Sequence, residues 1–147
     1  MKLLIQRVTS ANVRVDNKIV GEIDRGLLIF VGITHSDSEK DVKWLAQKVA
    51  KLRIFNDLEN KMNLALKDCN GAVLAISQFT LYADAANGNR PSFIAAARPQ
   101  FANTLYELFV AELRGLGITV QTGVFGADMQ VELINDGPVT IILESAF

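Results

Sequence analysis

The chain of 147 residues has one cysteine and one histidine, Cys69 and His35. A single cysteine excludes an internal disulfide, and these two residues are too few for a zinc site of cysteine and histidine ligands. No uninterrupted apolar run approaches the ~20 residues of a membrane-spanning helix, and residues 1–7 lack the features of a signal peptide. These absences favour the reducing setting of the cytoplasm, and we expect neither a metal nor a cofactor.

The chain also lacks an excess of charge of either sign, because 15 lysine and arginine residues stand against 16 aspartate and glutamate residues. Proteins that coat long stretches of nucleic acid normally carry a strongly basic face, so this balance argues against such a role. All the basic residues lie at or before Arg114, and the four charges after it are acidic. Residues 1–114 therefore carry +3 and residues 115–147 carry −4, which permits a modest basic surface on one side.

A lone histidine limits nucleophilic catalysis, because a serine or cysteine triad could use only His35. That residue follows an apolar segment, and we interpret it as a loop histidine without a catalytic role. Trp44 and the eight phenylalanines are expected mostly in the core, since their spacing does not indicate a platform for stacking bases.

Half of the residues are apolar and 21% are charged, which is the composition of a packed globular domain. Apolar or alternating segments predict strands, and these lie near residues 3–8, 11–15, 19–23, 26–33, 72–81, 118–120, 129–134 and 139–143. The last two flank a turn at residues 135–138, which predicts a C-terminal hairpin. Since there is no linker or repeat, we expect one domain over residues 1–147.

Two helices are predicted among these strands. Ser38 is a candidate N-cap with Asp41 three residues later, and apolar residues then recur at helical spacing over residues 42–52. Pro99 suits the first turn of a second helix, which a glycine at 115 or 117 ends. The pattern predicts an α+β fold with a largely antiparallel or mixed sheet and two main helices.

Lysines occupy the polar side of the first predicted helix, at positions that include Lys40, Lys43 and Lys51. They could form a strip that faces phosphates. We interpret them instead as an ordinary solvated face that contains a Glu39–Lys43 pair.

Two polar segments interrupt the apolar pattern, and the first ends the strand predicted at 72–81. Period-two alternation places Ser77 and Phe79 on one face of that strand, and Gln78 and Thr80 on the other. A buried hydroxyl or amide without a partner costs on the order of 1–3 kcal/mol. These groups either bond neighbouring backbone at the strand's end or serve a site, and the pattern alone favours the first interpretation.

The second polar segment, residues 135–140, reads NDGPVT. Its residues are typical of a turn, and proline is tolerated at the first position of a strand. The functional interpretation is a cis peptide between Gly137 and Pro138. Only about 5–6% of X–Pro bonds in folded proteins are cis, so the pattern alone favours an ordinary turn.

Together, the two segments are similar to the signature motifs of the bacterial-type D-aminoacyl-tRNA deacylases, the D-tyrosyl-tRNA(Tyr) deacylase family. Further matches in order and spacing lie at residues 6–8, 61–63, 88–93 and 123–129, so the resemblance spans essentially the whole chain. Residues 85–87 depart from it, because relatives often carry a basic residue there. The resemblance implies a homodimeric, cytoplasmic α+β enzyme with a barrel-like sheet, which hydrolyses the ester between a D-amino acid and tRNA.

The resemblance also implies the catalytic segment, which comprises Ser77, Gln78, Phe79 and Thr80. An aminoacyl ester beside a ribose hydroxyl is already reactive, so positioning and an oxyanion site can lower its barrier without reactive side chains. We hypothesise that backbone N–H groups around Phe79 and Thr80 bind the oxyanion while the ribose 2′-hydroxyl assists attack by water. Thr80 as a nucleophile ranks second, because nothing in the sequence is seen to activate its hydroxyl.

The resemblance assigns chiral selection to Gly137 and Pro138, whose cis peptide is expected to enter the active site of the partner subunit. Its carbonyl oxygens accept hydrogen bonds from the substrate ammonium, while backbone fills the direction of an L side chain. Glycine escapes this filter, so glycyl-tRNA formed on tRNA(Ala) is an expected second substrate. Other residues implied for the site are Met129 and Phe125 at the pocket, and Arg7 and Asn135, which hold the Gly-Pro turn.

Two other classes of function remain open from the residues alone. One is a small-metabolite-binding α+β oligomer without hydrolase activity, in which Gly137–Pro138 and Thr80 line a cleft between subunits. The other is a purely structural oligomer whose C-terminal strands form the interface. Selective deacylation of D-tyrosyl-tRNA separates the enzyme from both.

Overall fold

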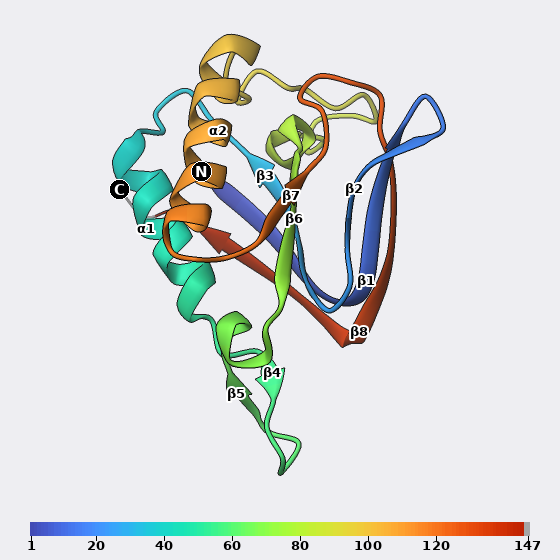
Figure 1. The fold of residues 1–147 in the computed structure, drawn as a ribbon. Coiled ribbons are helices and arrows are strands. Elements are labelled where there is room, and N and C mark those ends of the chain that lie inside the picture. The colour runs from blue at the N-terminus through green and yellow to red at the C-terminus, as the bar shows by residue number, and fades with distance from the viewer. Residues whose placement is uncertain (146–147) are drawn as a thin grey trace.

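A curved six-stranded sheet forms the body of the protein in the computed structural model, which describes residues 1–145 (Figure 1). Its order is β2-β1-β3-β6-β7, and β8 pairs with the other edge of β1, from Lys2 to Arg14. The pairs β3–β6 and β6–β7 are parallel and the others are antiparallel. The strands are β1 (Lys2–Val15), β2 (Lys18–Ile23), β3 (Gly26–Gly32), β6 (Ala72–Ser77), β7 (Val120–Thr122) and β8 (Gln130–Glu144).

The sheet curls until its two ends nearly meet, so the predicted barrel-like sheet is confirmed. Gly21 of β2 lies against β7 so closely that a Cβ atom there would come 2.5 Å from the carbonyl oxygen of Thr122. Only glycine permits this approach of two backbones. The mixed sheet and the single domain were also predicted correctly; residues 146–147 of that predicted domain lie outside the described residues.

Two predictions about strands were wrong at the ends of the chain. The segments 3–8 and 11–15 form one strand, β1, and the segments 129–134 and 139–143 form one strand, β8, rather than a hairpin. Both halves of β8 pair with β1, and Figure 1 shows β8 turning sharply between them. The predicted turn residues are therefore a bulge in a continuous edge strand.

The two predicted helices, α1 (Glu39–Lys51) and α2 (Pro99–Gly115), are confirmed. They lie side by side on one face of the sheet (Figure 1). The Asp41 carboxylate accepts hydrogen bonds from the Ser38 N–H at 2.9 Å and the Ser38 hydroxyl at 2.7 Å, which fixes the start of α1. The Tyr106 hydroxyl donates to the carbonyl of Ala75 at 2.8 Å and ties α2 to β6. No helix among residues 1–145 is both long and apolar enough to cross a bilayer.

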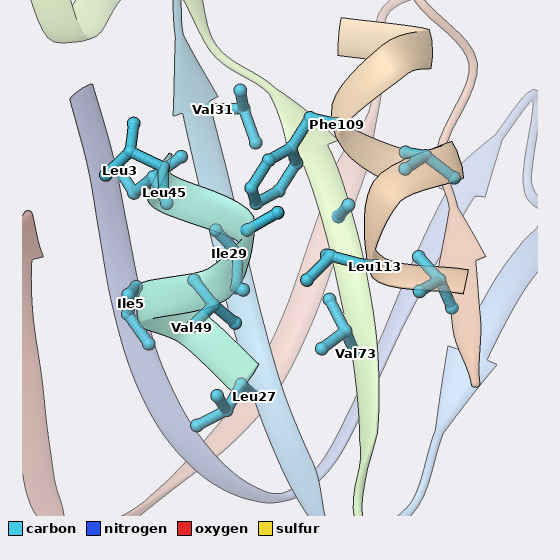
Figure 2. Packing of buried hydrophobic residues seen from close by; sticks show 14 of the residues in the cluster. Leu3, Ile5, Leu27, Ile29, Val31, Leu45, Val49, Val73, Phe109 and Leu113 are labelled. Carbon is cyan, nitrogen blue, oxygen red and sulfur yellow. The ribbon is translucent and has the colours of Figure 1, made fainter. Parts of the chain in front are cut away.

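Apolar side chains between the sheet and the two helices form the main core, which Figure 2 shows from close by. Alternate strand residues face the helices, as the period of a strand requires. The labelled members are Leu3, Ile5, Leu27, Ile29, Val31, Leu45, Val49, Val73, Phe109 and Leu113. A second cluster, which includes Val8, Leu28 and Leu74, fills the other face of the curled sheet.

The remaining elements are short. Strands β4 (Phe55–Asn56) and β5 (Met62–Leu64) form a hairpin that projects from the body below α1 in Figure 1. The 3₁₀ helix η1 (Leu66–Cys69) leads into β6, and a second 3₁₀ helix, η2 (Phe79–Tyr82), follows it. The prediction of a strand through residue 81 was therefore wrong beyond Ser77, and β7 lies two residues later than the strand predicted at 118–120.

Candidate active site

A cleft of about 640 Å³ opens at the carboxyl end of β6. Its walls come from β6 and η2, from the segment that leads into α2, and from the segment that leads into β8. The polar, aromatic or sulfur-containing residues at this cleft include Ser77, Gln78, Phe79, Phe93, Arg98, Phe125, Asp128 and Met129. Five of the residues predicted for the site therefore line this cleft, namely Ser77, Gln78, Phe79, Phe125 and Met129. A sixth, Thr80, lies beside it because it directly follows Phe79.

The chain leaves the sheet at Gln78, whose N–H makes the last ladder bond to the carbonyl of Val31 at 2.8 Å. Gln78 then adopts φ −146° and ψ 84°, and η2 begins at the next residue. The expected alternation is therefore wrong, because Ser77, Gln78 and Phe79 all line the cleft. The N–H groups of Phe79 and Thr80 open a helical turn, where N–H groups have no acceptor within the helix.

The hydroxyl of Thr80 accepts a hydrogen bond from the side-chain amide of Gln78. An amide is not a base, so this contact orients the hydroxyl without activating it. Burial, reinforced by the charge of Asp37, raises the pKa of the nearby Tyr82 phenol far above its ordinary value, so that phenol stays protonated at neutral pH. His35 is exposed and bonds the carbonyl of Ile94 at 2.8 Å, outside the residues that line the cleft.

Two phenylalanines at the cleft are exceptions to the expectation that these residues are mostly core. Phe79 and Phe93 are 56% and 40% exposed, and their rings meet edge to face with centroids 5.1 Å apart. The sequence offers a signal for Phe93, which lies in the segment 88–93 that resembles the family. Nothing in the spacing of the two residues shows that they pair, because 13 residues separate them in the chain.

The segment before β8 brings Phe125 and Met129 to the cleft, as the resemblance implies. Gly123 makes room for this segment, since a Cβ atom there would lie 2.5 Å from the Met129 sulfur. Sequence reasoning missed the two charged residues at the cleft, Arg98 and Asp128. Asp128 lies within a segment that resembles the family, whereas Arg98 has no signal except its place before Pro99.

The Gly137–Pro138 peptide is cis, and it lies in the bulge of β8 rather than at the cleft. Gln6 pairs with Thr140 and Val8 with Asn135, so residues 136–139 stand opposite Arg7 alone. Gly137 has φ +132°, and a Cβ atom on it would lie 2.9 Å from the Arg7 guanidinium. Both facts explain why glycine occupies this position.

Arg7 connects this bulge to the body of the protein. Its side chain is buried; Nε donates to the carbonyl of Asp136 at 2.9 Å and lies 3.3 Å from the Asp136 carboxylate. Nη1 donates to the carbonyl of Ile54 at 2.8 Å and to the side-chain oxygen of Asn56 at 3.1 Å. A planar guanidinium can make these bonds in two directions at once, so Arg7 locks the bulge against β4.

Asn135 closes the bulge at its base. Its side-chain oxygen accepts from the N–H of Val139 at 2.8 Å, and its amide donates to the Thr140 hydroxyl at 3.0 Å. The Gln6 amide donates to the same hydroxyl at 3.2 Å. These bonds span the four residues that protrude, so Asn135 supports the Gly-Pro turn without approaching the cleft.

One chain does not bring the two predicted motifs together. Arg7 pairs with Leu27 and Leu27 with Val73, so the bulge is level with Val73, whereas the catalytic segment follows Ser77. Four residues of strand separate these levels by roughly 13 Å, and three strand spacings add a similar lateral distance. The cleft and the Gly-Pro turn therefore occupy opposite ends of the sheet.

The chemistry available at the cleft comes from main-chain donors, hydroxyl and amide side chains, one arginine, one aspartate and an aromatic pair. Within residues 1–145 there is no group of three or more histidine, cysteine, aspartate or glutamate residues placed to hold a metal ion. Such a site suits a substrate that needs positioning and stabilisation of negative charge.

Comparison with known proteins gives consistent results over the full chain. The sequence profile of a family described as D-Tyr-tRNA(Tyr) deacylase matches residues 4–144. Relatives named D-aminoacyl-tRNA deacylase are 59% identical over 145 residues in Fusobacterium nucleatum and 56% identical over 146 residues in Chloroherpeton thalassium. Each alignment covers 99% of this chain and 96% of the relative.

Two solved structures share the fold. One, named c-Myc DNA unwinding element binding protein, superposes with a TM-score of 0.93 at 37% identity over 100% of both chains. The other, described as a probable eukaryotic D-amino acid tRNA deacylase, has a TM-score of 0.85 at 16% identity over 97% of both chains. At that identity the second likeness is one of fold.

Proposed function

The chain belongs to the D-Tyr-tRNA(Tyr) deacylase family and hydrolyses D-aminoacyl-tRNA, and we propose that it does so with main-chain groups at the cleft, completed by the Gly137–Pro138 turn of a second copy. The observation that supports the first part is the open cleft at the end of β6, where η2 begins at Phe79. The observation that supports the second part is the distance between that cleft and the turn within one chain.

The hydrolytic step needs stabilisation of an oxyanion more than it needs a nucleophile from the protein. Water attacks the ester carbonyl carbon, the carbonyl oxygen gains negative charge, and the ribose oxygen leaves as the bond to the amino acid breaks. The N–H groups of Phe79 and Thr80 start a helical turn beside the cleft, and they are the donors that we assign to the oxyanion. The neighbouring 2′-hydroxyl of the substrate orients the water and relays its proton to the leaving oxygen.

The aromatic pair gives this cleft a place for the end of the tRNA. Phe79 and Phe93 expose apolar ring surface directly at the catalytic segment. A base can stack on such a surface whatever its identity, which suits the common 3′-terminal adenosine of all tRNAs. Stacking there would fix the ribose, and with it the ester, next to the N–H groups of η2.

Chiral selection is assigned to the backbone of Gly137 and Pro138. Both residues are exposed at the tip of the β8 bulge, so their carbonyl oxygens are available to an ammonium group of a substrate in another subunit. With the ammonium and the ester both held, the side chains of D- and L-residues point in different directions. Backbone in the L direction excludes L-residues by contact, while glycine has no side chain to exclude.

A homodimer is part of the proposal, because each copy has both halves of the site but keeps them apart. Strand β8 is a long edge strand, and its outward residues Ile134 and Ile142 are 61% and 63% exposed. A free apolar edge of this length is a surface that proteins normally cover. A twofold dimer covers it twice and completes two sites at once.

We also propose that the enzyme works in the cytoplasm, because its substrate is aminoacyl-tRNA.

A paired deacylation assay tests the proposed function. Purified protein is incubated with D-tyrosyl-tRNA, L-tyrosyl-tRNA and glycyl-tRNA, and ester remaining on each is followed with time. We expect rapid loss of the D-ester, a stable L-ester and measurable loss of the glycyl ester. An intact glycyl ester beside a cleaved D-ester contradicts exclusion by shape. Intact esters on all three, with thermal stabilisation by a small metabolite, would instead favour a metabolite-binding oligomer.

A further inference from the structure

A second hollow, of about 380 Å³, lies along the end of α1 and the segment that follows it. Three of its six residues are cations and none is a carboxylate. We call it the α1 groove, and its residues are Trp44, Gln47, Lys48, Lys51, Leu52 and Arg53. The whole chain has a net charge of −1, so the α1 groove is locally much more positive than the protein as a whole.

The cations of the α1 groove are not neutralised by neighbouring carboxylates. Other lysines of the protein are paired: Lys43 lies 3.6 Å from Glu39, and Lys61 lies 2.8 Å from Glu59. In contrast, no carboxylate of the described residues lies within 4 Å of the Lys48 or Lys51 ammonium. Their positive charge is available to an anion from outside.

The other groups of the groove suit a sugar-phosphate chain. The Lys48 ammonium lies 5.1 Å from the centre of the Trp44 ring, so a flat apolar surface adjoins the charge. The Nε of Arg53 donates a hydrogen bond of 2.7 Å to the carbonyl of Asn63 and so anchors the guanidinium. This bond does not use the two terminal nitrogens, which can donate to a phosphate. Cations beside an aromatic ring are the groups that hold a nucleic-acid backbone without reading its sequence.

The helix offers a structural reason for part of this arrangement. Lys48 and Lys51 lie in the last turn of α1, where positive charge stabilises the negative end of the helix dipole. The helix dipole does not account for Arg53, which follows the helix. It also does not account for the hollow, because the dipole favours positive charge on any surface at the end of the helix. The expectation that the lysines of α1 are only a solvated face therefore leaves the groove unexplained.

The α1 groove lies at the same end of the molecule as the Gly-Pro turn. Arg53 directly precedes Ile54, whose carbonyl accepts the 2.8 Å bond from Arg7, and Arg7 in turn binds Asp136. In the proposed dimer, the turn of one copy enters the cleft of the other. The groove of the first copy then lies near the cleft that its own turn completes.

We propose that the α1 groove binds phosphates of the tRNA acceptor arm while the 3′ end of the same tRNA occupies the cleft of the partner subunit. This inference rests on the proposed function and names where the rest of the substrate lies. The proposed ligand is RNA, because the substrate of this enzyme is itself a polyanion that binds near the groove in the proposed dimer. The contact is independent of sequence, so it serves any tRNA.

The test compares two variants that each remove two exposed lysines. K48Q/K51Q removes unpaired charge from the groove, and K43Q/K61Q removes the same charge from lysines paired with glutamates. Each is assayed on D-tyrosyl-tRNA and on D-tyrosyl-adenosine, which has the ester but no acceptor-arm phosphates, across a series of salt concentrations. For K48Q/K51Q we expect KM on D-tyrosyl-tRNA to rise about tenfold and the slope of log KM against log salt to fall by about two.

The adenosine ester makes the outcomes separable. Under the proposal, K48Q/K51Q changes KM for D-tyrosyl-adenosine by less than about twofold, and K43Q/K61Q resembles wild type on both substrates. The proposal for the groove is overturned if K48Q/K51Q and wild type have equal KM and equal salt slope on D-tyrosyl-tRNA. It is also overturned if the two variants show equal increases in KM. Failure of the wild type to cleave either substrate overturns the proposed function itself.

Discussion

At the scale of single residues, the hydroxyl of Thr80 has no hydrogen-bonded base in the part of the chain that the structure describes. Thr80 is the residue that sequence reasoning ranks as a possible nucleophile, and its hydroxyl is bonded to the neutral amide of Gln78. A serine or threonine nucleophile needs an adjacent base to accept its proton. The geometry therefore agrees with a role for Thr80 in positioning, and we assign the stabilisation of the oxyanion to the N–H groups of Phe79 and Thr80.

Replacement of Thr80 by alanine separates these roles. If the hydroxyl only orients its surroundings, T80A should lower kcat on D-tyrosyl-tRNA by about tenfold or less, since the main-chain donors remain. Loss of a true nucleophile costs on the order of 10⁴–10⁶-fold. Single-turnover deacylation measures the difference, and T80S, which keeps a hydroxyl, is the matched control. A loss of the larger size in T80A, restored in T80S, would identify Thr80 as the nucleophile.

At the scale of elements, the start of α1 shows how a local sequence signal becomes stability. Asp41 is buried, and burial alone would raise the pKa of its carboxyl, but hydrogen bonding by Ser38 and Ser145 and the charge of the N-terminal amine together outweigh this and lower the pKa. A carboxyl whose pKa is lower in the folded state stabilises the protein above its unfolded pKa of about 3.9. That contribution is lost as the pH falls through the folded pKa.

D41N should therefore flatten the acid limb of the stability curve. We expect the free energy of unfolding in urea to fall by about 1 kcal/mol at pH 7, because the cap is weakened. Between pH 5 and pH 2.5 the variant should lose less stability than wild type. E39Q is the control, since it removes an exposed carboxylate from the same turn and leaves Ser38 and Asp41 intact. A D41N curve parallel to wild type would contradict the assignment.

Elements with strong local signals were predicted from the sequence, and elements fixed by distant partners were not. The cap at Ser38 and the apolar run of β3 depend on nearby residues, and both were predicted. The 3₁₀ helix η2 continues a strand-like sequence, so its start at Phe79 could not be foreseen. Strand β8 reads as a hairpin because residues 135–138 favour a turn, but pairing of both halves with β1 keeps it in one sheet.

At the scale of the whole molecule, the sequence resemblance named more residues of the candidate site than local reasoning could. It named residues at both ends of the sheet, including Phe125 at the cleft and Arg7 behind the turn, and the structure places them there. Their spatial relation depends on strand register and curvature, which residue spacing does not encode. Arg98 reaches the cleft only because α2 packs where it does, so its position needed the fold.

The proposed sharing of sites between subunits can be tested with two variants that damage different halves. A127W fills the cleft of its own chain, and G137A forces a side chain against Arg7 and distorts the turn. Each homodimer should be inactive. A co-expressed and purified heterodimer has one cleft and one turn intact on different chains, so it should show about half the wild-type activity per dimer. An inactive heterodimer would place the complete site within one chain.

The separation of the Gly-Pro turn from the cleft has a consequence for copies that have not yet found a partner. In the proposed mechanism such a copy has a cleft without the backbone that binds the substrate ammonium, so it should hydrolyse neither D- nor L-esters. Activity per chain should then fall steeply on dilution below the dissociation constant of the dimer. Tight association is in that case a condition for proofreading when only a few copies of the protein are present.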